Sequence, residues 1–94
     1  MTHSKRDANE AAIVRDLRLL GVWCLPLHRE AGFDLLLGFR DRLYAIEIKD
    51  PAQPPSKRRL TANEVNTQRA LALVDIPYCV CETLADVLAA LGLV

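Results

Sequence analysis

The sequence predicts a small α/β domain with the element order αβββαβα. Apolar residues recur at helical spacing in segments near both ends of the chain, and short apolar runs of strand length lie between them. Turn-forming glycines, prolines and charged residues separate these segments. Elements of this kind bury their apolar sides when helices flank a small mixed sheet, which is the architecture we expect.

The first helix is expected over residues 8–20 and the first strand over residues 22–27. Gly21 ends the helix, and Pro26 indicates that the strand lies at an edge of the sheet or ends there. The apolar positions of the helix lie one turn apart on a single stripe: Ile13, Val14, Leu17 and Leu20.

Two more strands are expected at residues 33–38 and 43–49, with a charged turn over residues 39–42. The later strand has apolar residues on both faces until Glu47, which is typical of a central strand. It then ends in Glu47 and Lys49, two charged side chains that packing does not explain.

The second half of the chain adds a helix, a strand and a helix. Residues 50–59 contain three prolines and are expected to form an irregular loop. Thr61 and Glu64 have the spacing of a capping box, which begins a helix of about a dozen residues. Residues 76–81 predict the last strand, and Thr83 caps the final helix.

Length and composition fit one globular domain over residues 1–94, with residues 1–7 expected to be flexible. The chain is 51% hydrophobic and 26% charged, unlike a disordered chain. No apolar run approaches the roughly 18 residues of a membrane span, and the polar N-terminus lacks the apolar stretch of a secretory signal. An odd number of cysteines cannot all pair within one chain, so we interpret Cys24, Cys79 and Cys81 as reduced thiols of a cytoplasmic protein.

The charge balance alone does not favour a nucleic-acid partner. Lys and Arg total 12 and Asp and Glu total 12, a formal net charge of zero, whereas nucleic-acid-binding proteins usually carry a basic excess. The sum over the whole chain hides local patches, however, because Lys57, Arg58 and Arg59 are consecutive.

Asp34, Glu47 and Lys49 are expected to meet at one end of the sheet. Side chains two residues apart leave the same face of a strand, so Glu47 and Lys49 share a face. A hairpin of the second and third strands places the start of one beside the end of the other, which brings Asp34 to Glu47. Two carboxylates within about 5 Å repel each other unless a cation lies between them or one is protonated.

A hard divalent cation suits such a site, because Mg²⁺ and Mn²⁺ prefer oxygen ligands. The ion polarises a phosphoryl oxygen and lowers the pKa of a bound water. The Lys49 ammonium can orient that water or offset charge on the phosphate. These residues therefore fit hydrolysis of a phosphodiester, whereas no Ser/His or Cys/His arrangement indicates nucleophilic catalysis.

Three parts of the sequence resemble the signature of PD-(D/E)XK nucleases: Glu10 on the first helix, Gly32-Phe33-Asp34 opening the second strand, and Glu47-Ile48-Lys49 ending the third. Residues 34–38 and 47–51, followed by Leu60-Thr61 opening a helix, are most similar to the VRR-NUC branch and its small phage-type relatives. The similarity extends from about Asp7 to Leu91 and implies a restriction-endonuclease-like core.

The resemblance also implies roles for these residues. Asp34 and Glu47 would bind Mg²⁺ or Mn²⁺, Glu10 would complete the metal shell, and Lys49 would serve the attacking water. Glu10 has a structural alternative, because Asp7 and Glu10 have the spacing of a capping box. The position of Glu10 on the apolar stripe of its helix favours the metal role.

Two positions depart from the family pattern. Phe33 stands where many relatives have proline, which is a tolerated change. Glu64 stands where the VRR-NUC branch often has glutamine, so no family role is carried onto it.

Candidate contacts to DNA surround these residues. The basic cluster is interpreted as a phosphate contact, with a solvated loop as the alternative. Three weaker candidates are His28 and Arg29, which precede the second strand, and Gln68, which lies one helical turn after Glu64. A surface role is the simpler interpretation for these residues. The full set is Lys57, Arg58, Arg59, Arg29, His28 and Gln68.

The resulting hypothesis is a Mg²⁺- or Mn²⁺-dependent DNA endonuclease of bacterial or phage origin that acts as a homodimer. One subunit offers one site, and symmetric cutting needs two sites related by a twofold axis. The resembled small nucleases imply a four-way junction as the leading substrate. Two alternatives stay open: a non-catalytic nucleic-acid-binding or assembly module with a nuclease fold, and a nuclease subunit that needs a helicase or another DNA-processing protein.

Overall fold

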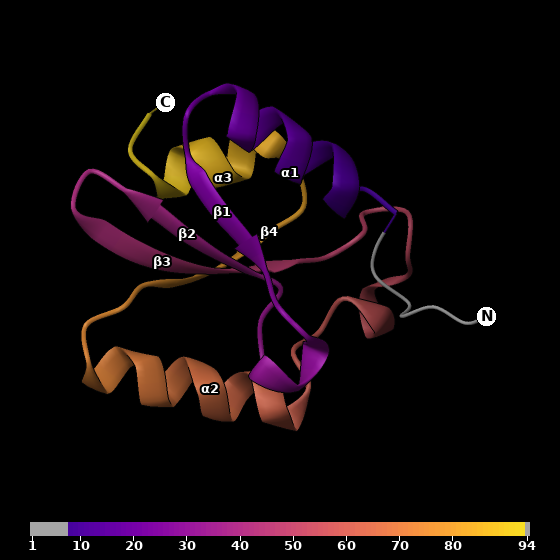
Figure 1. Cartoon of the computed structure of the whole chain (residues 1–94). Coiled ribbons are helices and arrows are strands. Elements are labelled where there is room, and N and C mark those ends of the chain that lie inside the picture. The colour runs from indigo at the N-terminus through magenta and orange to yellow at the C-terminus, as the bar shows by residue number, and fades with distance from the viewer. Residues whose placement is uncertain (1–7, 94) are drawn as a thin grey trace.

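The computed structural model describes residues 8–93 (Figure 1). The predicted flexibility of residues 1–7 concerns residues outside this range. The described chain has the predicted element order, with short 3₁₀ turns at Arg29–Ala31 and Pro55–Lys57. The helices are α1 (Glu10–Leu19), α2 (Ala62–Leu73) and α3 (Leu84–Ala90), and the strands are β1 (Trp23–Pro26), β2 (Leu35–Phe39), β3 (Arg42–Ile48) and β4 (Tyr78–Cys81).

The strands form one mixed sheet in the order β1-β2-β3-β4. β1, β2 and β3 are a continuous antiparallel meander, whereas β4 lies parallel to β3. Parallel neighbours need a long crossover connection, and the loop with α2 supplies it. β3 is therefore central, as predicted, and β1 with its proline lies at an edge.

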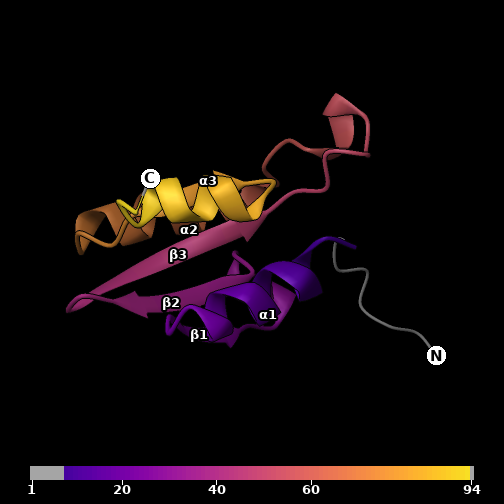
Figure 2. The same ribbon diagram turned by 90° about the horizontal axis from the view of Figure 1, so that it is seen from above.

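Helices cover both faces of the sheet, with α1 and α3 on one face and α2 on the other (Figure 1). Seen from above, α1 lies on the β1 and β2 side of the sheet and α3 on the far side of β3 (Figure 2), where α3 contacts β4. The core lies under α1 and α3, and its fully buried members include Leu17, Leu35, Leu37, Ile46, Ile48 and Val87. Because side chains alternate along a strand, the intervening residues of β2 and β3 face α2. None of the twelve residues of α2 is fully buried, so this second layer is thin.

The structure moves several predicted boundaries by one or two residues. β2 begins at Leu35 instead of Phe33, β3 ends at Ile48 just before Lys49, and β4 begins at Tyr78 instead of Ile76. Pro77 explains the last difference, because proline can accept a ladder hydrogen bond but cannot donate one. Its carbonyl accepts the Ala45 N–H at 2.8 Å.

Gly32 packs directly against α2 at the entrance to β2. Its φ is +87°, in the left-handed region, and a Cβ at this position would collide with the hydroxyl of Thr67. Gly21, which ends α1 as predicted, has nearly the same φ, +86°, but a Cβ added there would meet no atom within 4 Å apart from its chain neighbours. The two glycines therefore share a backbone conformation and differ in their surroundings.

Gly32→Ala is expected to destabilise the fold more than Gly21→Ala. Both changes carry the cost of a left-handed non-glycine residue, about 1–2 kcal/mol. Only Gly32→Ala adds steric overlap with α2, which costs about another 1–3 kcal/mol. Urea denaturation measures the free energy of unfolding of both variants. Equal losses would show that the Gly32–Thr67 approach is not tight.

Within residues 8–93 no helix is long and apolar enough to cross a membrane. Cys24, Cys79 and Cys81 are all free thiols. Burial raises the pKa of the Cys81 thiol to about 12, so this side chain stays protonated in the core. The free thiols agree with the prediction that the three cysteines are reduced.

Candidate active site

Asp34 and Glu47 lie opposite each other across the β2–β3 pair. Leu35 pairs with Ile46, so the residue before Leu35 faces the residue after Ile46. The Asp34 N–H donates to the Ile46 carbonyl at 3.0 Å, which continues the ladder. Asp34 Oδ2 accepts the Ile48 N–H at 2.7 Å, and this bond holds the carboxylate against β3. The hairpin thus brings the two acids together, as its topology predicts.

Lys49 lies between two carboxylates. Its Nζ is 3.1 Å from Glu47 Oε2 and 3.1 Å from Glu64 Oε1 on α2. Glu47 and Lys49 are only 4% and 8% exposed. Charged side chains are seldom buried unless they are paired. The α2 side of the sheet therefore ends in a polar cluster of two buried residues, Glu47 and Lys49, and two partly buried ones, Asp34 and Glu64. It is called the carboxylate–lysine cluster below.

Electrostatics favour a proton or a cation at Glu47. Burial, the neighbouring Glu64 carboxyl and the charge of Asp34 raise the pKa of Glu47 from 4.5 to about 9, against the opposing effect of Lys49. Burial by itself would lower the pKa of Lys49, but hydrogen bonds to Glu64 and Glu47 raise it overall. Burial would likewise raise the pKa of Glu64, but bonds from Thr61 and the cluster lower it overall. Lys49 and Glu64 thus stay charged, and Glu47 is the group that favours added positive charge.

Tyr78 of β4 lies near the cluster. Its hydroxyl donates to the Gly32 carbonyl at 2.7 Å, and its ring meets Phe33 edge-on with centroids 6.2 Å apart. Burial and the charges of the three nearby carboxylates raise the pKa of Tyr78, so the hydroxyl stays protonated. Tyr78 was not predicted as a site residue, because packing alone accounts for a tyrosine in a strand.

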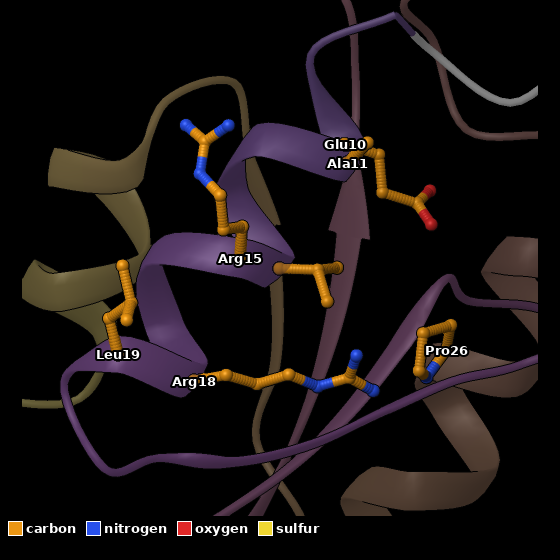
Figure 3. Close-up of a pocket in the computed structure, with 7 residues that line it drawn as sticks. Glu10, Ala11, Arg15, Arg18, Leu19 and Pro26 are labelled. Carbon is orange, nitrogen blue, oxygen red and sulfur yellow. The ribbon is translucent and has the colours of Figure 1, made fainter.

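Glu10 is 4% exposed, in agreement with its place on the apolar stripe of α1. It is the first residue of α1 and Asn9 is the N-cap, so Glu10 does not hold the third position of a capping box. Its side chain lies at one end of a groove of about 720 Å³ between α1 and β1, along which Arg18 extends toward Pro26 (Figure 3). α1 lies on the face of the sheet opposite α2 (Figure 1). The role of Glu10 in a metal shell therefore stays a prediction.

The start of α1 is nevertheless tied to the same end of the sheet. The Asn9 side-chain amide donates to the Lys49 carbonyl at 3.3 Å and to the Glu82 carbonyl at 2.6 Å. Across residues 8–93, no three His, Cys, Asp or Glu side chains lie close enough together to hold one metal ion. The predicted three-carboxylate shell is therefore not preformed in the described chain.

The donor set of the cluster fits Mg²⁺ or Mn²⁺ through two residues, Asp34 and Glu47. Glu47 Oε1 is buried and accepts no hydrogen bond from any residue in 8–93. Such an oxygen beside a second carboxylate suits a hard cation, and Mg²⁺ usually completes its coordination with water. Asp34 and Glu47 are thus the residues that would hold the ion.

The basic loop is only partly available to a phosphate. Arg58 Nη1 donates to Glu82 Oε2 at 3.0 Å, so this cation is already paired within the fold. Lys57 and Arg59 are exposed. Of the three predicted phosphate contacts, Lys57 and Arg59 are therefore exposed cations, whereas Arg58 between them is held in an ion pair within the fold.

The weaker DNA-contact candidates divide between surface and site. His28 and Arg29 are exposed, and His28 Nδ1 accepts the Glu30 N–H at 3.4 Å, which caps the 3₁₀ turn. Gln68 is partly buried and lines a hollow of about 360 Å³ that also includes Arg42 and Tyr78. Gln68 therefore faces the sheet near Tyr78.

Comparisons of the chain with protein-family models, curated proteins and solved structures found no match. Its class is therefore defined by fold and site: a small α/β domain with a partly buried carboxylate–lysine cluster at one end of a four-stranded mixed sheet. Such a cluster can bind a divalent cation and present an ammonium beside it.

Proposed function

We propose that the chain is a Mg²⁺- or Mn²⁺-dependent endodeoxyribonuclease with a PD-(D/E)XK, restriction-endonuclease-like core, acting on branched DNA such as four-way junctions. The observation that carries this proposal is the burial of Glu47 and Lys49 opposite Asp34. Burying charges costs stability unless they are paired, and a purely structural strand end has no need of them. A phosphodiester hydrolase, in contrast, needs such charges at its active site.

Three residues of the cluster have a part in the proposed reaction: Asp34, Glu47 and Lys49. Asp34 and Glu47 hold the ion, and the bond from the Ile48 N–H keeps the Asp34 carboxylate in place. A bound Mg²⁺ or Mn²⁺ supplies Lewis acidity and a more acidic water. The Lys49 ammonium donates to the attacking water or a phosphate oxygen and offsets the developing negative charge.

Cleavage of defined DNA tests the proposal directly. Purified protein is incubated with single-stranded, duplex, flap and four-way-junction DNA in Mg²⁺, Mn²⁺, Ca²⁺ or chelator. We expect cleavage in Mg²⁺ or Mn²⁺, most of it on the junction, and none in chelator. Ca²⁺ is expected to support little turnover, because its longer and more variable coordination positions water and phosphate poorly. Activity that persists in excess chelator would overturn the metal assignment.

A homodimer is part of the proposal, because one subunit carries one cluster and two strands must be cut. Exposed apolar side chains support it. Trp23 and Leu43 flank Gly38 on the part of the sheet that α2 leaves open, and they are 54% and 43% exposed. Apolar surface of this kind is typical of an interface when it is contiguous. Light scattering of the purified protein measures the mass in solution.

A second candidate is a non-catalytic nucleic-acid-binding module, or a nuclease subunit completed by a partner protein such as a helicase. One observation favours it: within residues 8–93 no group of three His, Cys, Asp or Glu side chains is arranged to hold one metal ion. DNA binding without cleavage of any structure, in any of the metals above, would support this candidate over the first.

Replacing Lys57 and Arg59 together by alanine is expected to weaken DNA binding on all sequences alike. Each phosphate contact releases counterions, so losing two should reduce the slope of log affinity against log salt by up to about 2. Adding Arg58→Ala should reduce this slope less than the first two changes, because Arg58 is paired with Glu82. Fluorescence anisotropy over a salt series measures affinity and slope. An unchanged slope would mean that the loop is only solvated surface.

A further inference from the structure

One carboxylate oxygen of Glu64 takes part in two sets of hydrogen bonds, the cap of α2 and the contact with Lys49. It is the third residue of α2 and forms a capping box with Thr61. Thr61 Oγ1 accepts the Glu64 N–H at 3.2 Å, and Glu64 Oε1 accepts the Thr61 N–H at 2.9 Å. The same Oε1 accepts a hydrogen bond from Lys49 Nζ at 3.1 Å. The capping box therefore fixes the oxygen that holds the ammonium.

Lys49 needs a partner other than Glu47. Ordering a long lysine side chain costs rotamer entropy, which a fixed acceptor must offset. Glu47 is the carboxylate assigned to the metal in the proposed function. A cation held there would repel the ammonium and compete with it for the same carboxylate. Glu64 lies on α2 and keeps its capping geometry whether or not Glu47 is engaged.

Building on the nuclease function proposed above, we propose that Glu64 is a positioning residue that holds the Lys49 ammonium at the active site and couples the N-terminus of α2 to it. Glu64 does not contact the substrate in this arrangement. It acts through Lys49, whose ammonium it orients from α2.

The chain contains a matched control for this arrangement in α3. Thr83 Oγ1 accepts the Asp86 N–H at 3.1 Å, and Asp86 Oδ2 accepts the Thr83 N–H at 3.2 Å. This is the same capping box. Within residues 8–93, the Asp86 carboxylate accepts backbone N–H groups and makes no ion pair with a lysine. Changes at Asp86 therefore remove a cap without disturbing Lys49.

Three variants separate capping from positioning. Glu64→Met removes both the cap and the acceptor for Lys49. Glu64→Gln keeps an amide oxygen that can serve both, since glutamine is also accepted at this position of a capping box. Asp86→Ala removes the α3 cap and the hydrogen bond from the Glu82 N–H, but no contact to Lys49. Losing a helix cap lowers stability, so urea denaturation first confirms that all three variants are folded.

The first readout does not depend on catalysis. Amine-reactive labelling of the metal-free protein, followed by mass spectrometry, compares Lys49 with the exposed Lys57 as an internal reference. We expect labelling of Lys49 to rise severalfold in Glu64→Met and to stay near the parent level in Glu64→Gln and Asp86→Ala. Unchanged labelling in Glu64→Met would overturn the proposal, whatever the protein cleaves.

The second readout is single-turnover cleavage of junction DNA with a parallel metal titration. Glu64→Met is expected to cleave about 10- to 100-fold more slowly, which is the scale of a misplaced catalytic group, with DNA affinity unchanged. Glu64→Gln should recover most of the rate, and Asp86→Ala should match the parent. A Glu64→Met variant that cleaves at the parent rate would overturn the positioning role. A parent protein that cleaves none of the DNA structures refutes the nuclease function instead, and the labelling result still decides whether Glu64 holds Lys49.

Discussion

Lys49→Ala is expected to slow single-turnover DNA cleavage by about 10²-fold or more, the scale on which enzymes lose one group that stabilises the transition state. Asp34 and Glu47 remain, so metal affinity should stay near that of the parent. The ammonium that lies 3.1 Å from Glu47 is lost, and with it the cation that orients water or offsets charge on the phosphate. DNA binding should largely persist, because phosphate contacts are spread over the basic loop and the rest of the surface.

Two further variants serve as controls for misfolding and for a general loss of charge. Lys49→Met keeps most of the side-chain volume and tests whether the charge itself matters. Arg40→Ala removes a positive charge from the β2–β3 turn, at the opposite end of the hairpin from the cluster. Circular dichroism checks that each variant is folded. If Lys49→Ala and Lys49→Met both cleave like the parent, the nuclease assignment is wrong and the binding-module hypothesis replaces it.

The element order and the meeting of Asp34 with Glu47 could be predicted because both depend on local signals. Apolar periodicity distinguishes helices from strands, and a hairpin with a short turn leaves one register that buries the apolar face. Once that register is set, the residue before Leu35 must face the residue after Ile46. The side chains of Glu47 and Lys49 then share a face by simple alternation.

Glu64 could not be identified as part of the cluster, because its local pattern already had a sufficient explanation. The Thr61–Glu64 spacing predicts a capping box, and the structure contains one. That the same carboxylate also reaches Lys49 depends on how α2 crosses the sheet. Tyr78 was missed for a related reason, since the parallel register of β4 against β3 is set by tertiary packing and not by any pattern in the strand itself.

Helical periodicity has a limit at Glu10, whose role in a metal shell stays a prediction. Its burial followed from helical periodicity, but periodicity cannot tell which end or face of a sheet a buried acid approaches. The structure places α1 over the face that Leu35 and Ile46 occupy, whereas Glu47 faces α2. Arg58 is a similar case, because its partner Glu82 lies 24 residues away and no local pattern relates them.

Glu47→Gln is expected to abolish metal binding and turnover together while stabilising the metal-free protein at high pH. The pKa of Glu47 is raised in the folded protein from 4.5 to about 9, chiefly by burial and then by Glu64 and Asp34. Between these two values folded Glu47 keeps a proton that the unfolded chain has released. The contribution of Glu47 to stability is therefore full below about pH 4.5 and is lost as the pH rises toward 9. Glutamine is neutral throughout, so the variant lacks this decline.

Asp34→Asn tests the second carboxylate and is matched by a control in the hairpin turn. The amide oxygen of asparagine can still accept the Ile48 N–H, so the fold should survive while metal affinity and turnover fall. Asp41→Asn removes the same charge from the exposed turn at the other end of the hairpin. Asp41 has a φ of +67°, which asparagine tolerates. This control should bind metal and cleave DNA like the parent.

Thermal denaturation in chelator, from about pH 5 to pH 9, and calorimetric titration with Mg²⁺ or Mn²⁺ measure both effects. The difference in Tm between Glu47→Gln and the parent should grow as the pH rises. Added metal should raise the Tm of the parent and of Asp41→Asn, because a ligand that binds only the folded state stabilises it, and should leave Glu47→Gln unchanged. If the metal stabilises Glu47→Gln as much as the parent, the ion is held elsewhere in the protein. Glu47 would then be a buried acid whose pKa is raised by burial and by its carboxylate neighbours, without a role in holding the ion.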